Sequence, residues 1–96
     1  MIASFKDNAT ADLYHGRETK RVRNFPPNVK RVALRKLDVH NAAHVLEDLR
    51  EPPGNRLKAL KGNLLGYHSI RVNDQWRIVF RWEGNNAVEV SLTDYH

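Results

Sequence analysis

Cysteine is absent from the sequence, and so is any hydrophobic run long enough to cross a bilayer. The lack of cysteine excludes a disulfide framework and a thiolate zinc site, so the core must hold without covalent links between side chains. The first thirty residues contain no apolar run of signal-peptide length. Glycine-rich phosphate loops and nucleophile elbows are missing as well. From these absences we expect a cytoplasmic protein that does not enter a membrane.

The residues that are present suit one small basic domain. The chain has 96 residues, of which 41% are hydrophobic, and we expect a single domain over residues 1–96. Sixteen Lys and Arg residues stand against eleven Asp and Glu residues, so the formal net charge is +5. This charge favours a polyanionic partner, which is RNA, DNA or an acidic protein.

The N-terminal half predicts helices. Residues 1–5 are expected to form a short strand, after which Asp7 or Asn8 caps a helix of about two turns that ends at Gly16. A second helix is predicted from Asn28 to Val39, because Pro27 suits a first helical turn and apolar residues recur on one face.

Two further segments of this half lie outside those helices. Asn41 is expected to cap a short third helix through Leu49, which the Pro-rich stretch 51–54 must end. Residues 17–36 hold eight basic residues and only Glu18 as an acid, and their first half, 17–26, predicts a mobile loop. The segment either contacts RNA phosphates or is an ordinary solvated surface.

The C-terminal half predicts an antiparallel sheet. Apolar and polar residues alternate over 67–72, 76–82 and 87–93, with turn-forming residues between these runs. The predicted fold class is therefore α+β, with N-terminal helices packed on a small antiparallel β-sheet.

Alternation also predicts which side chains share a face. If Trp76, Ile78, Phe80 and Trp82 face the core, Arg77 and Arg81 face the other side. A three-residue loop at 73–75 then places Arg71 beside Arg77. A five-residue loop at 83–87 would place Val88, Val90 and Leu92 on the core side and pair Arg81 with Glu89.

Metal-independent RNA cleavage needs a base for the ribose 2′-hydroxyl, cations for the phosphate and an acid for the leaving oxygen. The outer sheet face offers Arg71 and Arg77 as cations, and Lys58 and Lys61 precede the sheet. At the end of the chain, His96 titrates near neutral pH, Tyr95 can stack on a base, and Asp94 can orient His96 or bind Arg77.

Each of these residues also has a purely structural interpretation. Alternation alone requires a polar residue at position 77, surface lysines are usually just solvated, and terminal residues usually fray. The histidines form no spaced set with carboxylates, so we expect neither a metal site nor a cofactor. From these residues alone, the prediction is a basic α+β domain with an RNA-facing sheet.

Several motifs resemble HigB and GraT type toxins of the RelE superfamily, and their order extends the likeness over nearly the whole chain. These motifs are the opening 1–5, Pro52-Pro53-Gly54-Asn55-Arg56-Leu57, Leu60-Lys61-Gly62, residues 66–72, residues 73–77 and the ending Asp94-Tyr95-His96.

The resemblance implies a RelE-like fold and a catalytic set consisting of Arg77, Tyr95, His96, Asp94 and Lys61. Arg77 would stabilise the phosphate, Tyr95 and His96 would line the cleavage site with Asp94 in support, and Lys61 would add a cation. Some HigB proteins have a catalytic histidine where Lys58 stands; we expect a phosphate contact from this lysine. The other expected RNA contacts are Arg56, Arg71 and Arg81. Convergence of the last three residues requires a bend after Leu92 or Thr93.

The function implied by the resemblance is that of a toxin that cleaves messenger RNA in the ribosomal A site without a metal ion. Its partners would be the ribosome and a HigA-like helix-turn-helix antitoxin, through which the complex would bind operator DNA. The alternative is a non-catalytic RNA-binding or ribosome-associated domain, which the charge alone supports equally well.

Overall fold

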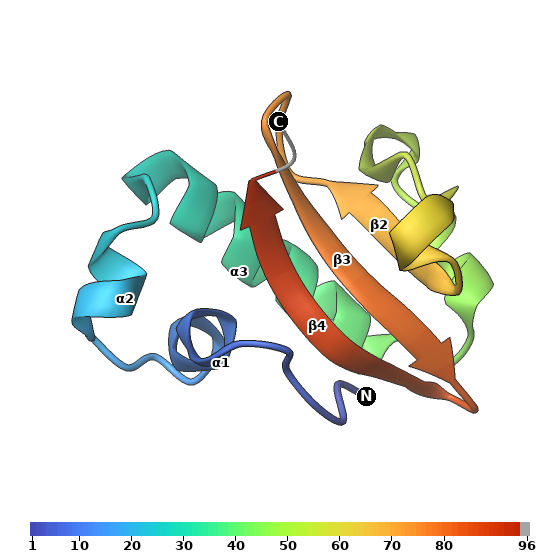
Figure 1. Cartoon of the computed structure of the whole chain (residues 1–96), viewed down its shortest axis with the longest axis horizontal. Coiled ribbons are helices and arrows are strands. Elements are labelled where there is room, and N and C mark those ends of the chain that lie inside the picture. Colours follow the sequence, from blue (N-terminus) through green and yellow to red (C-terminus); the bar gives the residue numbers. More distant parts are fainter. Residues whose placement is uncertain (95–96) are drawn as a thin grey trace.

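The computed structural model describes residues 1–94 and has helices on one side of a four-stranded antiparallel sheet (Figure 1). This confirms the predicted α+β class. The strands stand in the order β1-β2-β3-β4, which is also their order along the chain. The elements are α1 (Asn8–Tyr14), α2 (Lys20–Arg23), α3 (Pro27–Ala42), the 3-10 helices η1 (Leu46–Arg50), η2 (Pro53–Asn55) and η3 (Gly62–Leu64), and the strands β1 (Lys58–Ala59), β2 (Tyr67–Arg71), β3 (Trp76–Glu83) and β4 (Asn86–Asp94).

The first helix forms as predicted, whereas residues 1–5 make two isolated bridges in place of the expected short strand. Asp7 caps α1, because its side chain accepts a hydrogen bond of 2.8 Å from the backbone nitrogen of Thr10. Gly16 follows the helix with φ +74°, a left-handed conformation that glycine adopts readily. The segment before α1 runs parallel to β4, with bridges from Ile2 to Ala87 and from Phe5 to Val90. It therefore covers an edge of the sheet.

Residues 17–26 are more ordered than predicted. They contain the short helix α2, and Val22 and Phe25 are only 2% and 8% exposed. The buried carboxylate of Asp12 accepts hydrogen bonds from Arg17, Thr19 and Arg21, which join this segment to α1. Burial alone would raise the pKa of Asp12, but these three hydrogen bonds outweigh burial and lower it. The predicted structureless loop is therefore wrong, and the prediction that it is mobile stays untested.

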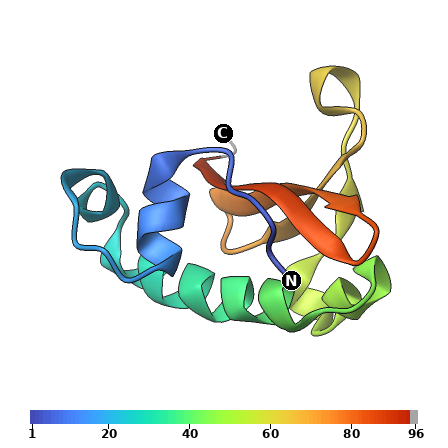
Figure 2. The ribbon, with the colours of Figure 1, turned by 90° about the horizontal axis from the view of Figure 1, so that it is seen from below.

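Helix α3 packs its apolar face under the sheet (Figure 2). The predicted face is confirmed, since Val29, Ala33 and Leu37 are buried against sheet residues such as Ile78 and Phe80. Burial of this apolar face stabilises the fold, because removing apolar surface from water is favourable. Among residues 1–94, no helix combines the length and the hydropathy that crossing a bilayer requires.

The end of α3 differs from the prediction in two ways. The helix continues to Ala42, and Asn41 caps no further helix, because its side-chain oxygen accepts a hydrogen bond from the Ile2 backbone nitrogen at 3.1 Å. Instead, Asp48 within η1 accepts hydrogen bonds from the backbone nitrogens of His44 and Val45, and these bonds lower the pKa of Asp48. The Asp48 side chain, which lies inside η1, therefore caps the start of η1, a role that we had expected of Asn41.

The β2–β3 register is the one predicted. Arg71 lies opposite Arg77 and Tyr67 lies opposite Arg81. Ile78 and Phe80 are fully buried on the core side, and Trp76 and Trp82 pack against the same core while keeping part of their surface exposed.

The β3–β4 hairpin departs from the prediction at its turn. A two-residue turn at Gly84 and Asn85 replaces the expected five-residue loop, and a bulge between Val79 and Arg81 restores the pairing further along. As a result Val88 lies opposite Arg81, away from the core, where we had expected it to face the core. Ala87 takes the buried place instead. The bulged residue, Glu89, has φ +51°.

Candidate active site on the outer face of the sheet

The sheet face opposite α3 carries several charged side chains, although Ser69 and Val79 at its centre are buried. In Figures 1 and 2, α3 covers one face of the sheet, and the loop that carries η3 rises on the other side. Alternation places Arg71, Arg77 and Arg81 on this face, which we call the outer face. Lys58 lies opposite Ser69, so it belongs to the same face. The predicted RNA-facing sheet therefore has several cations on one side.

Arg77 is held in place by two groups that sequence reasoning did not identify. Its Nε donates to the hydroxyl oxygen of Ser69 at 2.8 Å, and its Nη2 donates to the backbone carbonyl of Arg56 at 2.9 Å. Ser69 is fully buried. Since the two acceptors bind two different nitrogens of one planar group, they fix the orientation of the guanidinium as well as its position.

Arg71 is the cross-strand neighbour of Arg77, so two cations meet on adjacent strands. Like charges directly opposite in a sheet are destabilising unless a counter-charge is near. Asp74 supplies one, because its carboxylate forms an ion pair with Arg71. The Arg71 side chain keeps 35% of its surface exposed, so a ligand phosphate can still reach it.

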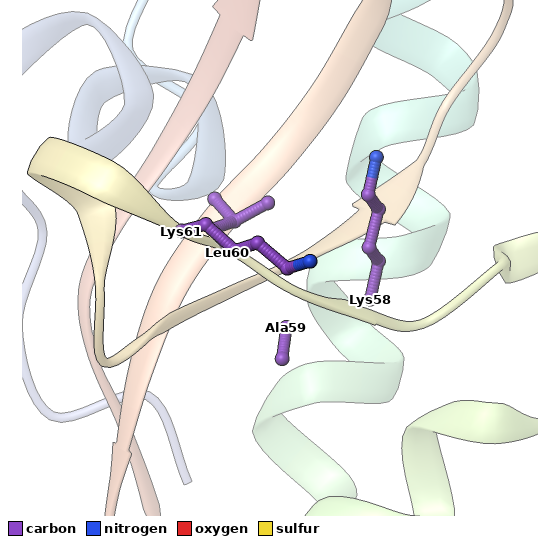
Figure 3. Close-up of a pocket in the computed structure, with 4 residues that line it drawn as sticks. All are labelled: Lys58, Ala59, Leu60 and Lys61. Atoms are coloured by element: carbon purple, nitrogen blue, oxygen red, sulfur yellow. The ribbon is translucent and has the colours of Figure 1, made fainter.

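The two predicted lysines lie at one hollow beside the outer face. A cavity of about 320 Å³ is lined by Lys58, Ala59, Leu60 and Lys61. Figure 3 shows the Lys61 side chain extending along β1 towards Lys58. Leu60, which follows β1 directly, is 4% exposed and is the buried residue of this lining. The structure thus brings Lys58 and Lys61 together.

Arg81, which we expected to contact RNA, is engaged by two carboxylates. Its guanidinium lies 3.0 Å from Glu89 and 3.4 Å from Glu83, and the Tyr67 hydroxyl donates to Glu89 at 3.0 Å. The hydrogen bond with Glu89 raises the pKa of both Arg81 and Tyr67, whereas Arg81 and Tyr67 lower the pKa of Glu89. The charge of Arg81 is largely compensated inside the protein, whereas Lys58 and Lys61 form no ion pair with any residue of the range 1–94.

The predicted bend near the end of the chain is not found at Leu92 or Thr93. Strand β4 pairs regularly there, with Leu92, Thr93 and Asp94 opposite successive residues of β3. Asp94 accepts a hydrogen bond of 2.9 Å from Gln75, and alternation places it on the face opposite to Arg77. Tyr95 and His96 lie outside the described residues, so their predicted roles stay predictions.

The remaining histidines do not form a metal site within residues 1–94, where no three His, Cys, Asp or Glu side chains gather. His40 lies in the last turn of α3 and is fully buried. Its Nδ1 lies 2.9 Å from the Lys36 carbonyl, and burial lowers its pKa from 6.5 to about 4. It is therefore a neutral core residue near pH 7.

Comparison with solved structures supports the fold. The YoeB–YefM complex from Staphylococcus aureus contains a chain that matches all of this protein with a TM-score of 0.62 at 19% identity and 98% coverage of that chain. The YoeB/ParE toxin from Agrobacterium tumefaciens matches with a TM-score of 0.51, also at 19% identity, over 100% of this protein and 99% of the other chain. At such identities the likeness establishes the architecture only.

Sequence comparison is more specific. Residues 3–96 match the family model of the RelE-like toxin of type II toxin-antitoxin system HigB. Toxin HigB-1 of Vibrio cholerae is 41% identical over 92 residues, which cover 96% of this chain and 95% of that toxin. A Haemophilus influenzae protein is 36% identical over 92 residues, or 96% of this chain and 88% of that protein. The chain therefore belongs to the HigB family of RelE-like toxins of type II toxin-antitoxin systems.

Proposed function

We propose that this toxin is a ribosome-dependent endoribonuclease that cleaves messenger RNA in the A site without a metal ion and so stops translation and growth. The observation that carries the proposal is the fixed guanidinium of Arg77 on the outer face, beside Arg71 and on the same sheet as Lys58. A preorganised cation is what a developing phosphorane charge requires, because it stabilises the transition state without reorganising.

The cations of the outer face would bind the phosphate, and the last residues of the sequence would supply proton transfer and base stacking. The 2′-oxygen of the ribose would attack the adjacent phosphorus while a base takes its proton, and the 5′-oxygen of the next nucleotide would leave with a proton from an acid. Arg77 would bind the phosphate oxygens, and Lys61 and Lys58 would supply further positive charge. His96 remains our choice for the base, with Tyr95 stacking on a nucleotide base.

Two macromolecular partners follow from the same proposal. The net charge of +5 would draw the toxin to ribosomal RNA, whose binding would then weaken with salt. A HigA-like helix-turn-helix antitoxin would hold the toxin inactive and connect it to operator DNA. One structural neighbour is a toxin-antitoxin complex of YoeB with YefM, which supports partnership with an antitoxin in general.

The decisive experiment compares wild type, Arg77→Ala and Arg50→Ala after induction in a bacterial host. Arg50 lies on η1 with 60% of its side chain exposed, so its removal matches the loss of one positive charge. New messenger RNA 5′ ends should map to A-site codons for wild type and Arg50→Ala and vanish for Arg77→Ala, while all three sediment with ribosomes. Ribosome binding without any new ends would favour a non-catalytic ribosome-associated domain.

A further inference from the structure

The loop between η1 and β1, residues 51–57, has a buried polar side chain at its centre. Asn55 is 1% exposed, and its Nδ2 donates to the carbonyl oxygens of Leu49 and Glu51, each at 3.1 Å. Its Oδ1 accepts a hydrogen bond from Lys36 Nζ of α3. One side chain therefore ties this loop both to η1 and to the long helix.

The next residue has a rare backbone conformation. Arg56 has φ 48° and ψ 56°, in the left-handed region that residues other than glycine seldom enter. Its backbone nitrogen donates to the Pro53 carbonyl at 3.1 Å, and its own carbonyl accepts from Arg77 Nη2 at 2.9 Å. Such a conformation persists only where the surroundings hold it, and the bonds of the adjacent Asn55 do so.

We propose that Asn55 is a positioning residue for Arg77. By holding the loop, it aims the Arg56 carbonyl at the guanidinium, so that Arg77 is fixed from the loop as well as by Ser69 on β2. The part concerning catalysis rests on the proposed function, because it assumes that Arg77 binds the reacting phosphate. Because Asn55 is buried, it acts on Arg77 only through this chain of contacts.

The first test observes the guanidinium directly and needs no activity. In the purified full chain, nitrogen-15 NMR reports rotation about the Nε–Cζ bond of Arg77, whose signal Arg77→Lys identifies by its disappearance. Asn55→Ala should speed this rotation by about tenfold, because losing one hydrogen bond typically costs about that factor. Asn28→Ala, at an exposed position of α3, is the matched control and should leave it unchanged. Equal rotation in Asn55→Ala and wild type would overturn the proposal.

The second test measures cleavage on programmed ribosomes. Asn55→Ala should lower the rate at saturating toxin by about tenfold and leave the half-saturating concentration unchanged, since a misaimed cation affects the transition state most. In an Arg77→Lys background, which lacks the forked donor, Asn55→Ala should cause no further loss. An equal loss in both backgrounds would show a merely structural role and overturn the proposal.

The two tests distinguish failure of the proposed ribonuclease function from failure of the proposal that Asn55 positions Arg77. If wild type cleaves nothing, the proposed function fails, and NMR still decides whether Asn55 positions Arg77. If Asn55→Ala does not fold, Lys36→Met takes its place, because it removes the donor to Asn55 Oδ1 from a partly exposed side chain. Faster Arg77 rotation in Lys36→Met would support the proposal, and unchanged rotation would contradict it.

Discussion

Replacing His40 with leucine should make the free energy of unfolding depend less on pH in the acid range. The imidazole is fully buried, its ring meets that of Phe80 edge-on at 4.7 Å, and its Nε2 has no hydrogen-bond partner among residues 1–94. Its pKa is lowered to about 4, first by burial and then by the positive charges of Lys36 and the N-terminal amine. Protonating His40 in the folded state would bury an uncompensated charge.

The size of the effect follows from proton linkage. The unfolded chain binds a proton at His40 as the pH falls through 6.5, whereas the folded chain does so only near pH 4. The stabilisation is therefore complete above pH 6.5 and is lost as the pH falls through this window. At about 1.4 kcal/mol per pKa unit, the full loss is about 3 kcal/mol, of which about 2 kcal/mol has occurred by about pH 5.

Urea unfolding of wild type and His40→Leu at about pH 7.5 and about pH 5 measures how much stability is lost through His40 on acidification. Other titrating groups are common to both chains, so the difference between the two pH dependences isolates His40. Wild type should lose about 2 kcal/mol more than the variant on acidification. His44→Leu, which removes an exposed imidazole, is the control. Parallel pH dependences for wild type and His40→Leu would refute the reasoning.

Three other predictions concern the core and the outer face. Phe80→Ala should lower the free energy of unfolding by about 3 to 5 kcal/mol in urea titrations, because it leaves a cavity between α3 and the sheet. Glu89→Gln should lower the pKa of Tyr67 towards its ordinary value in a spectrophotometric alkaline titration, and an unchanged pKa would show that Glu89 does not cause the shift. Arg71→Ala should reduce the slope of log affinity against log salt for ribosome binding by about 1, whereas an unaltered slope would mean that Arg71 contacts no phosphate.

Where local rules govern, the sequence predicted the structure well. The Asp7 cap, the buried stripe of α3 and the alternation of β3 each depend on neighbours within a few residues. The β2–β3 register followed from the short loop at 73–75, since moving a strand by one residue would turn its buried side chains to solvent.

Contacts between elements, which local patterns do not show, explain two of the three main errors. Residues 17–26 have no apolar period, and their order comes from the Asp12 carboxylate and from the burial of Val22 and Phe25. The turn at Gly84 and Asn85 could have been recognised from its Gly-Asn pair, but the bulge at Glu89 depends on the pairing of β3 with β4.

The candidate site was predicted only in part. Alternation placed Arg71 and Arg77 side by side, and the structure confirms this. The groups that hold Arg77 include a backbone carbonyl, whose direction depends on the fold of a loop and carries no signal in residue type. The contribution of Asn55 could not be predicted from the sequence, because its three partners lie in α3, η1 and the loop and come together only in the folded chain.

The pairing of the first residues with β4 sets the order in which the protein can mature. Ser4 accepts a hydrogen bond from the backbone of Glu89, a residue 85 positions later in the chain. During translation the early segment must wait for a partner that is made 85 residues later, so the sheet edge closes only after β4 has emerged from the ribosome. A growing chain therefore cannot complete this edge of the sheet until β4 has left the ribosome.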